Sequence, residues 1–310
     1  VTLPALAEGE SLKGSGTEKD PYLIENAGDL AAFRDKVNNG DNAICAKLTN
    51  DITLSGNWTP FAYKDAVKNA FTGTFDGDNH KIIGLKIQNA TNSDQGLFGT
   101  VNTGTVKNLM VEGNISSSNN NVGGVVGNLY NGTVVNCSFT GTVRSTKSGA
   151  YVGGIAGNAG NKSKAATISG CVNYGSVNGG TVGGIVGCAT KTTVENSYNT
   201  GEINGTEKSA GIAGTLGKSC KVKNCFNIGE VKGTVTTGGI TGFKNGNATI
   251  ENCYYKAPTG VTYTCEQGTV IQDDGLTPEK LKDATSGETA FKDGSNGYPI
   301  LKWQESDAPV

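Results

Sequence analysis

The chain has 310 residues, of which 47 are Gly, 17% are charged and 7% are aromatic, and its formal net charge is -2. This composition excludes a disordered polyampholyte and a strongly basic nucleic-acid-binding protein. One His and one Met disfavour imidazole catalysis and histidine-built metal sites, and we interpret His80 as a turn or strand-surface residue. Because no run of eighteen apolar residues occurs and the chain opens at Val1 without a leader pattern, we expect neither a membrane span nor a signal peptide.

The first predicted element is an amphipathic helix. Asn26 is a typical N-cap, the apolar positions are Leu30, Phe33 and Val37, and the helix should end near Asn39-Gly40. The repeats that follow in the chain predict a solenoid, and a solenoid exposes an open apolar core at each end. We therefore expect this helix to plug the first coil.

Strands are predicted next, near residues 44–48, 52–54, 71–75 and 82–87. The segment Asp76-Gly77-Asp78-Asn79 has the look of half a calcium loop, but it lacks the later bidentate Glu. We interpret it as a turn between two strands.

A four-residue signature then repeats six times: Gly, two apolar or small residues, Gly. The copies lie at residues 96–99, 124–127, 154–157, 184–187, 211–214 and 239–242, at intervals of 27–30 residues. A unit of this length cannot bury its apolar face alone, so the units must stack on one another. The sequence therefore predicts a solenoid.

The second half of each repeat has the alternation of short strands with Gly or Asn corners, and both residues tolerate the left-handed backbone of a sharp turn. Stacking turns each position into a column. One predicted corner column is Asn108, Asn136, Gly170, Asn196, Asn224 and Asn252. The next column is Leu109, Cys137, Cys171, Ser197, Cys225 and Cys253. Its small side chains suit a narrow interior, so we interpret its thiols as core residues.

Eight Cys in an extracellular chain would also fit a disulfide framework. Side chains stacked on neighbouring coils point in parallel, however, whereas a disulfide brings the two Cβ atoms to about 3.8 Å. We expect mostly free thiols, and the pairs most able to bridge are Cys253 with Cys265 and Cys188 with Cys220.

At the C-terminal end, Thr277-Pro278-Glu279 predicts a helix start with Pro at the first helical position, running through Leu281. A terminal strand is predicted over residues 298–303. We expect these elements to cover the second end of the stack.

Charge is uneven along the chain. Residues 101–250 contain twelve Lys and Arg against five Glu and no Asp, a local balance of +7. These cations either keep solenoid turns soluble or face an anionic partner such as a sulfated or uronic-acid glycan. Variable loops on a rigid rod are usual sites of recognition. The candidate binding residues in such loops are Arg144, Lys147, Lys162 and Lys164.

The sequence contains few residues in patterns typical of catalysis. Glycoside hydrolysis needs two positioned carboxylates roughly 5–9.5 Å apart. Within residues 101–250 only Glu202 and Glu230 share a slot on consecutive coils, and we interpret them as a solvated strand edge. We therefore assign no catalytic, cofactor-binding or metal-binding residue and expect no cofactor.

Taken together, these motifs resemble the GLUG-motif repeat proteins of bacterial cell surfaces. Residues 96–99 read Gly-Leu-Phe-Gly, and the flanking motifs that carry the resemblance are residues 14–17, 21–24, 48–52, 58–60, 71–77 and 296–303. Two departures are Ala62, where similar proteins often have Gly after the Trp-x-Pro segment, and Thr241 in the last copy. The resemblance implies a right-handed parallel β-helix in a secreted or surface-anchored protein, often an adhesin, without catalytic residues to transfer.

The fold we predict is all-β: a right-handed parallel β-helix of about 27–30-residue coils with short helical caps at both ends. We expect an N-terminal extension or linker over residues 1–20, a capping helix and first coils over 21–95, the repeat body over 96–256, and a C-terminal cap over 257–310.

The predicted function is that of a non-enzymatic, monomeric adhesin on the bacterial surface or in the extracellular space, binding glycan or host or matrix ligands, such as a host surface protein, through its loops. We expect no nucleic-acid partner. A polysaccharide-active β-helix enzyme or its accessory module, and a passive surface spacer, are the alternatives.

Overall fold

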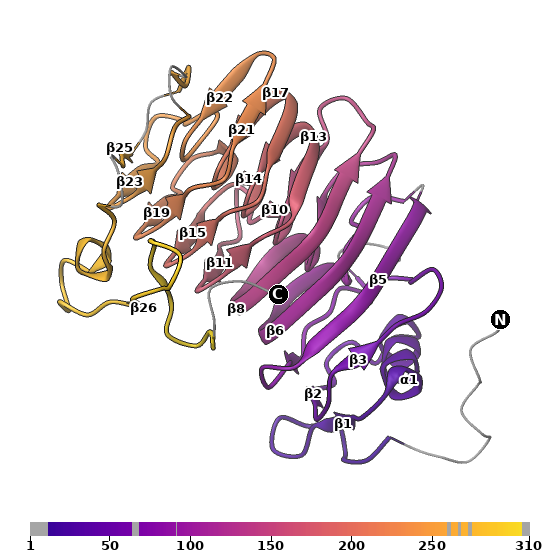
Figure 1. The fold of residues 1–310 in the computed structure, drawn as a ribbon. Coiled ribbons are helices and arrows are strands. Elements are labelled where there is room, and N and C mark those ends of the chain that lie inside the picture. Colours follow the sequence, from indigo (N-terminus) through magenta and orange to yellow (C-terminus); the bar gives the residue numbers. More distant parts are fainter. Residues whose placement is uncertain are drawn as a thin grey trace.

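The computed structural model describes residues 12–63, 68–90, 92–258, 262–265, 268–271 and 275–305. These residues form a parallel β-helix, as the repeat predicts (Figure 1). Equivalent positions of successive coils pair directly: Ile168 lies opposite Val134 on one side and opposite Val194 on the other. The 27–30-residue repeat in the sequence is therefore one turn of the solenoid.

The coils build five stacks of parallel strands, which we number I to V in chain order from the Gly-x-x-Gly signature. Two long strands, β6 (Phe98–Ser117) and β8 (Val126–Ser145), run through several corners and take part in stacks I to IV. The other strands of stack I are β10 (Ala156–Ala159), β14 (Val186–Ala189) and β18 (Ala213–Leu216). Stack II adds β1 (Tyr22–Ile24), β2 (Ala46–Leu48), β4 (Thr74–Asp76), β11 (Ala166–Ser169), β15 (Thr192–Glu195), β19 (Lys221–Lys223) and β23 (Thr249–Glu251).

Stack III follows stack II along each coil. It contains β3 (Ile52–Thr53), the start of β5 (Lys81–Ala90), β12 (Val172–Asn173), β16 (Tyr198–Asn199), β20 (Phe226–Asn227), β24 (Tyr254–Tyr255) and β25 (Thr269–Val270). Stack IV continues with β13 (Ser176–Gly183), β17 (Ile203–Ala210) and β21 (Val231–Gly233). Stack V pairs β7 (Val122–Gly123), β9 (Tyr151–Gly153) and β22 (Thr236–Gly238) with the ends of β13 and β17.

The N-terminal end is closed by α1 (Ala27–Asn38), as predicted (Figure 1). The Asn26 side chain caps it by accepting hydrogen bonds from the Gly28 and Asp29 amides. Phe33 is fully buried, and its ring lies 5.7 Å from Phe61 and 5.9 Å from Phe75 between ring centroids. The helix therefore fills the open apolar core of the first coil.

Ala62 follows this aromatic cluster and has a φ of 53°, in the left-handed region. Its backbone amide donates to the side-chain oxygen of Asn38 at the end of α1. The position at which similar proteins often have Gly is thus one where Gly would be favoured. The hydrogen bond to Asn38 helps to hold Ala in this conformation.

The predicted Asn corner column is confirmed. All five Asn residues have φ between 48° and 52°, and Gly170, which replaces Asn once, has φ of 63°. Where two Asn residues are adjacent in the column, their amides bond from coil to coil: Asn136 donates to Asn108 at 3.2 Å, and Asn224 to Asn196 at 3.3 Å. Asn at this corner therefore supplies both the left-handed turn and a hydrogen bond to the preceding coil.

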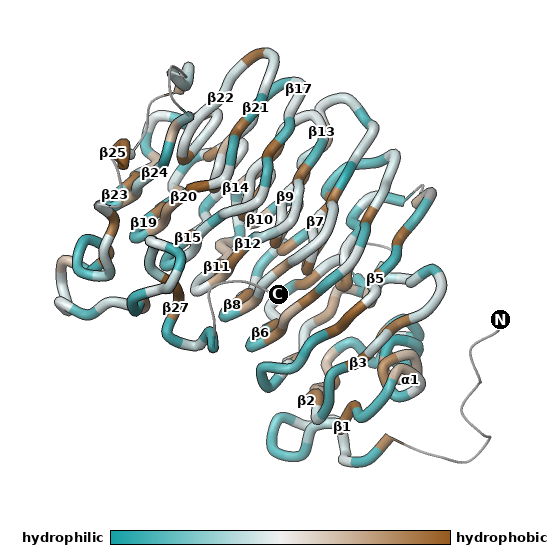
Figure 2. Tube along the Cα trace, in the orientation of Figure 1, coloured by the Kyte–Doolittle hydropathy of each residue, from teal (hydrophilic) through white to brown (hydrophobic). Residues whose placement is uncertain are grey.

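The interior is continuous through the stack, with apolar positions recurring at the same place in successive coils (Figure 2). The predicted thiol column lies inside it, where burial raises the pKa values of Cys137 and Cys225 and keeps these thiols protonated. All eight Cys lie in the described ranges and are free, including Cys188, Cys220, Cys253 and Cys265.

A second interior row explains the first Gly in three copies of the Gly-x-x-Gly signature. Asn173, Asn199 and Asn227 are fully buried in stack III, and each side chain donates to the next, at 2.7 Å in both cases. This row abuts the first Gly in three copies of the signature, Gly154, Gly184 and Gly211. A Cβ atom on Gly184 would lie 2.5 Å from the Asn199 side chain and 2.1 Å from the carbonyl oxygen of Gly211. No larger residue fits the corner without moving backbone.

The C-terminal elements lie elsewhere than expected. We predicted that they cover the second end of the stack, but η1 (Pro278–Leu281), β26 (Phe291–Lys292) and β27 (Ile300–Leu301) lie along the outer side of stack III (Figure 1). The η1 segment is a 3-10 helix, and β27 pairs antiparallel with β26. The reason is an outward-facing apolar row on stack III, which this segment covers.

Replacing Gly184 by Ala should destabilise the solenoid by about 3 kcal/mol, because the added methyl overlaps a buried amide and a backbone carbonyl of the next coil. Urea denaturation of the two proteins measures the difference. Gly246→Ala is the matched control, since a Cβ at that position meets nothing within 4 Å. Equal losses in both variants would mean that the signature Gly is not required by close packing.

Candidate functional site

The outward face of stack III carries a row of residues in register across successive coils: Lys81, Met110, Ser138, Val172, Tyr198, Phe226 and Tyr254. The C-terminal segment packs on the later members of this row. The rings of Tyr198 and Phe226 stack at 4.6 Å with 5° between their planes, and Phe291 lies 5.7 Å from Phe226. The earlier members, from Lys81 to Ser138, line a groove instead.

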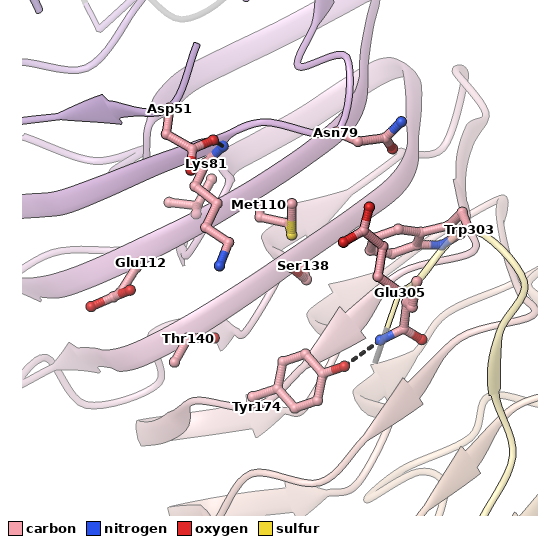
Figure 3. Close-up of a pocket in the computed structure, with 12 residues that line it drawn as sticks. Asp51, Asn79, Lys81, Met110, Glu112, Ser138, Thr140, Tyr174, Trp303 and Glu305 are labelled. Carbon is pink, nitrogen blue, oxygen red and sulfur yellow. Dashed lines mark hydrogen bonds between the residues drawn. The ribbon is translucent and has the colours of Figure 1, made fainter. Parts of the chain in front are cut away.

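This groove has a volume of about 410 Å³ and lies between the early coils and the last described residues of the chain (Figure 3). Its floor is formed by outward side chains of stack III, among them Met110, Ser138 and Thr140. Tyr174, Trp303 and Gln304 form its wall. The wall therefore combines the β-helix with residues more than a hundred positions later in the chain.

Hydrogen bonds hold the wall in place. The Trp303 indole N–H donates to the carbonyl oxygen of Gly170 at 2.9 Å, at the one Gly of the Asn corner column. Gln304 is buried; its amide N–H donates to the Tyr174 hydroxyl, and its carbonyl oxygen accepts from the Tyr198 hydroxyl at 3.0 Å (Figure 3). Burial and the neighbouring Tyr174 raise the pKa of Tyr198, so the Tyr198 hydroxyl remains a neutral donor. The half-buried Trp303 ring is thereby fixed against the groove.

The charged side chains around the groove are mainly acidic. Asp51, Glu112 and Glu305 line it together with a single Lys81. One oxygen of Asp51 is engaged by the Lys81 backbone amide at 2.9 Å and by the His80 ring at 3.2 Å. The site therefore offers carboxylate acceptors beside an aromatic ring, with a local excess of negative charge.

His80 and Ser138 do not come together in this groove. His80 contacts Asp51. In the register of stack III, Ser138 lies opposite Met110, and Met110 lies opposite Lys81, the residue that follows His80. Two coil spacings, about 9.6 Å, thus separate Ser138 from the coil of His80, well beyond hydrogen-bond reach. His80 lies at the turn and strand surface that the sequence predicts.

The carboxylates of Glu202, Glu230 and Asp76 also have partners. Glu202 and Glu230 both contact the ammonium of Lys232, at 2.6 and 3.0 Å, which lowers the pKa of Glu202. The segment after Asp76 is a turn, as predicted: the His80 amide bonds the carbonyl of Gly77. Although partial burial opposes it, hydrogen bonds from the Asp78 amide and the Asn108 side chain lower the pKa of Asp76. Within the described ranges, no group of three or more His, Cys, Asp or Glu is arranged to hold a metal ion.

The four predicted binding residues lie in two separate loops. Arg144 is exposed at the end of β8, and Lys147 follows it, donating to the Asn119 side chain at 3.3 Å. Lys162 and Lys164 are exposed in the loop between β10 and β11, where Asn161 accepts from the Lys164 amide. One loop precedes stack V and the other joins stacks I and II. The groove, by contrast, was not predicted, because only the position of the C-terminal segment brings Trp303 to Gly170 and Gln304 to Tyr174.

Comparison with known proteins agrees with the repeat. Residues 118–144 and 178–204 match the family model described as the GLUG motif, and each match contains one Gly-x-x-Gly copy. A solved structure described as a "putative immunoglobulin A1 protease" from Bacteroides ovatus superposes with a TM-score of 0.74 and 26% sequence identity, over 94% of this chain and 95% of that one. The fold is thus shared with a solved protein along almost its whole length.

Two curated relatives match about a third of the chain. Halomucin from Haloquadratum walsbyi is 33% identical over 110 residues, and a "Putative Gly-rich membrane protein" from Evansella cellulosilytica is 32% identical over 108 residues. These matches span 1% and 12% of the relatives' own lengths. In the part of this chain that the structure describes, no helix is long and apolar enough to cross a bilayer.

The attachment of the C-terminal segment should weaken in acid. The Asp283 carboxylate accepts from the Ser286 and Thr285 amides and contacts Lys223 of stack II at 3.2 Å, which lowers its pKa to about 2. The unfolded value is about 3.9, so the stabilisation is complete above about pH 4 and is lost as the pH falls to about 2. Asp283→Asn should therefore increase hydrogen exchange of residues 276–304 at pH 7 but leave it unchanged near pH 2.

Asp293→Asn, an exposed change in the same segment, is the control for this experiment. A difference between Asp283→Asn and the native chain that persists undiminished near pH 2 would contradict the assigned role of the carboxylate.

Proposed function

We propose that this GLUG-repeat β-helix is a non-enzymatic adhesin of the bacterial cell surface that binds an extracellular ligand, glycan or protein. The observation that carries the proposal is the groove of about 410 Å³ on the side of the solenoid, which is walled by fixed aromatic residues and in which Ser138 lies two coils from His80. A rigid scaffold with a preformed groove is suited to binding.

The names of the relatives support the location. One relative is called a halomucin and another a Gly-rich membrane protein, and both are much longer than the region they share with this chain. A repeat segment within a long surface protein fits a solenoid whose coils stack without a globular core.

An enzyme is the second candidate, because the solved structure that covers almost the whole chain is described as a protease. Against it, the sole His of the sequence contacts Asp51 and is two coils from Ser138, and Glu202 and Glu230 are paired with Lys232. Incubation with immunoglobulin A1, and a reducing-end assay on uronic-acid polysaccharides with added calcium, test this candidate directly. Turnover of either substrate would replace the adhesin proposal.

The purified chain should bind saturably to at least one member of a panel of glycans and matrix proteins, and binding should persist at physiological salt. Attachment driven only by the basic loops should fall steeply as salt is raised, since exposed charges are screened. Surface plasmon resonance at low and physiological salt makes the comparison. Complete absence of binding would favour the passive spacer.

The contribution of the loops is tested separately. Replacing Arg144, Lys147, Lys162 and Lys164 by Ser should reduce binding of sulfated or uronic-acid polymers without lowering the melting temperature, because all four are exposed. Unchanged affinity for these polymers would mean that the four loop residues do not contribute to binding.

A further inference from the structure

We propose that the groove beside Trp303 binds an uncharged saccharide segment, at a site distinct from the basic loops. This inference rests on the proposed adhesin function and specifies the ligand class of one of its surfaces.

Trp303 provides an apolar platform of fixed orientation. Its only polar atom is committed to the Gly170 carbonyl, so the half-buried ring has no remaining polar group to satisfy and presents carbon to the groove. Met110 adds a second apolar surface on the floor. A pyranose ring has one face of C–H groups, which packs on such a surface and is desolvated there.

Opposite the ring, the early coils supply hydrogen-bonding groups at a regular spacing. Glu112 and Thr140 occupy the same outward slot on β6 and β8 and are in direct register, about 4.8 Å apart. A carboxylate accepts hydrogen bonds only, whereas a hydroxyl both donates and accepts. Adjacent sugar hydroxyls, which are donors and acceptors themselves, can pair with both.

The charge of the groove selects against anionic polymers. Asp51, Glu112 and Glu305 line it against one Lys81, so a sulfate or uronate would enter a site with excess negative charge. The volume of about 410 Å³ lies within the usual range of small-ligand pockets, roughly 300–1,000 Å³. A short neutral oligosaccharide segment therefore fits the groove better than the polyanions that the basic loops would attract.

The experiment is a titration of the full chain with neutral oligosaccharides and with their uronic-acid and sulfated counterparts, followed by tryptophan fluorescence and calorimetry. Neutral ligands should change the emission of Trp303, while Trp58, which is 6% exposed and lies in the N-terminal aromatic cluster, acts as an internal reference. Uronic-acid ligands should bind this site at least 10-fold more weakly.

Glu112→Ala should weaken neutral-saccharide binding roughly 10-fold, the effect of losing one hydrogen bond to a charged acceptor. This variant leaves the C-terminal segment intact, because Glu112 lies on β6 and is exposed. Trp303→Ala should abolish binding. Thr140→Ala should also weaken binding, because it removes the hydroxyl next to Glu112. Thr200→Ala is its matched control, since Thr200 occupies the equivalent slot two coils further on, outside the groove.

The outcomes separate this inference from the proposed function. Neutral-saccharide binding that survives Glu112→Ala and Trp303→Ala, tighter binding of anionic ligands in the groove, or binding only of matrix proteins would overturn the inference and leave the adhesin in place. Loss in the groove variants together with retention in Thr200→Ala and Arg144→Ser supports it. A chain that binds no glycan or protein at all overturns both.

Discussion

Backbone contact between successive coils at the Gly-x-x-Gly corner is the constraint on which this molecule depends. The corner abuts a buried row of Asn173, Asn199 and Asn227, whose amides bond to one another and to the carbonyl oxygen of the Gly two residues further along the chain. An interior amide is costly unless it is fully hydrogen-bonded, and the regular stack provides partners on both sides. Because the row leaves no space for a Cβ at Gly154, Gly184 and Gly211, the buried Asn row requires the first Gly in these three copies of the signature.

The same regular stacking produces the groove. A row that is repeated on the outer face of stack III is apolar over the later coils, with Tyr198 and Phe226 stacked in parallel, and the chain returns over it with Phe291. Towards the early coils the row changes to Ser138, Met110 and Lys81. The C-terminal segment reaches the row where it changes from apolar to polar. The segment therefore both covers an apolar surface and forms the wall of the groove.

The distribution of charge gives the two candidate binding surfaces opposite preferences. The loops that carry Arg144, Lys147, Lys162 and Lys164 are basic, whereas the groove is lined mainly by carboxylates. Long-range attraction to a polyanion and short-range recognition of a neutral ligand can therefore occur on different sides of the solenoid. Ion pairs such as Lys232 with Glu202 and Glu230 satisfy carboxylates along stack IV and leave the groove as the place where acceptors gather around an aromatic ring.

The repeat, the left-handed Asn corners, the interior thiol column and the helix that closes the first coil were all determined by the sequence, because each depends on local backbone preference or on a period that stacking must respect. Asn173, Asn199 and Asn227 could also have been recognised, since each follows a member of the thiol column by two residues. Only the tertiary structure decided where residues 276–304 lie, that Trp303 bonds to Gly170 and that Gln304 bonds to Tyr174. These contacts join positions more than a hundred residues apart, and no periodicity relates an irregular segment to the coil it covers.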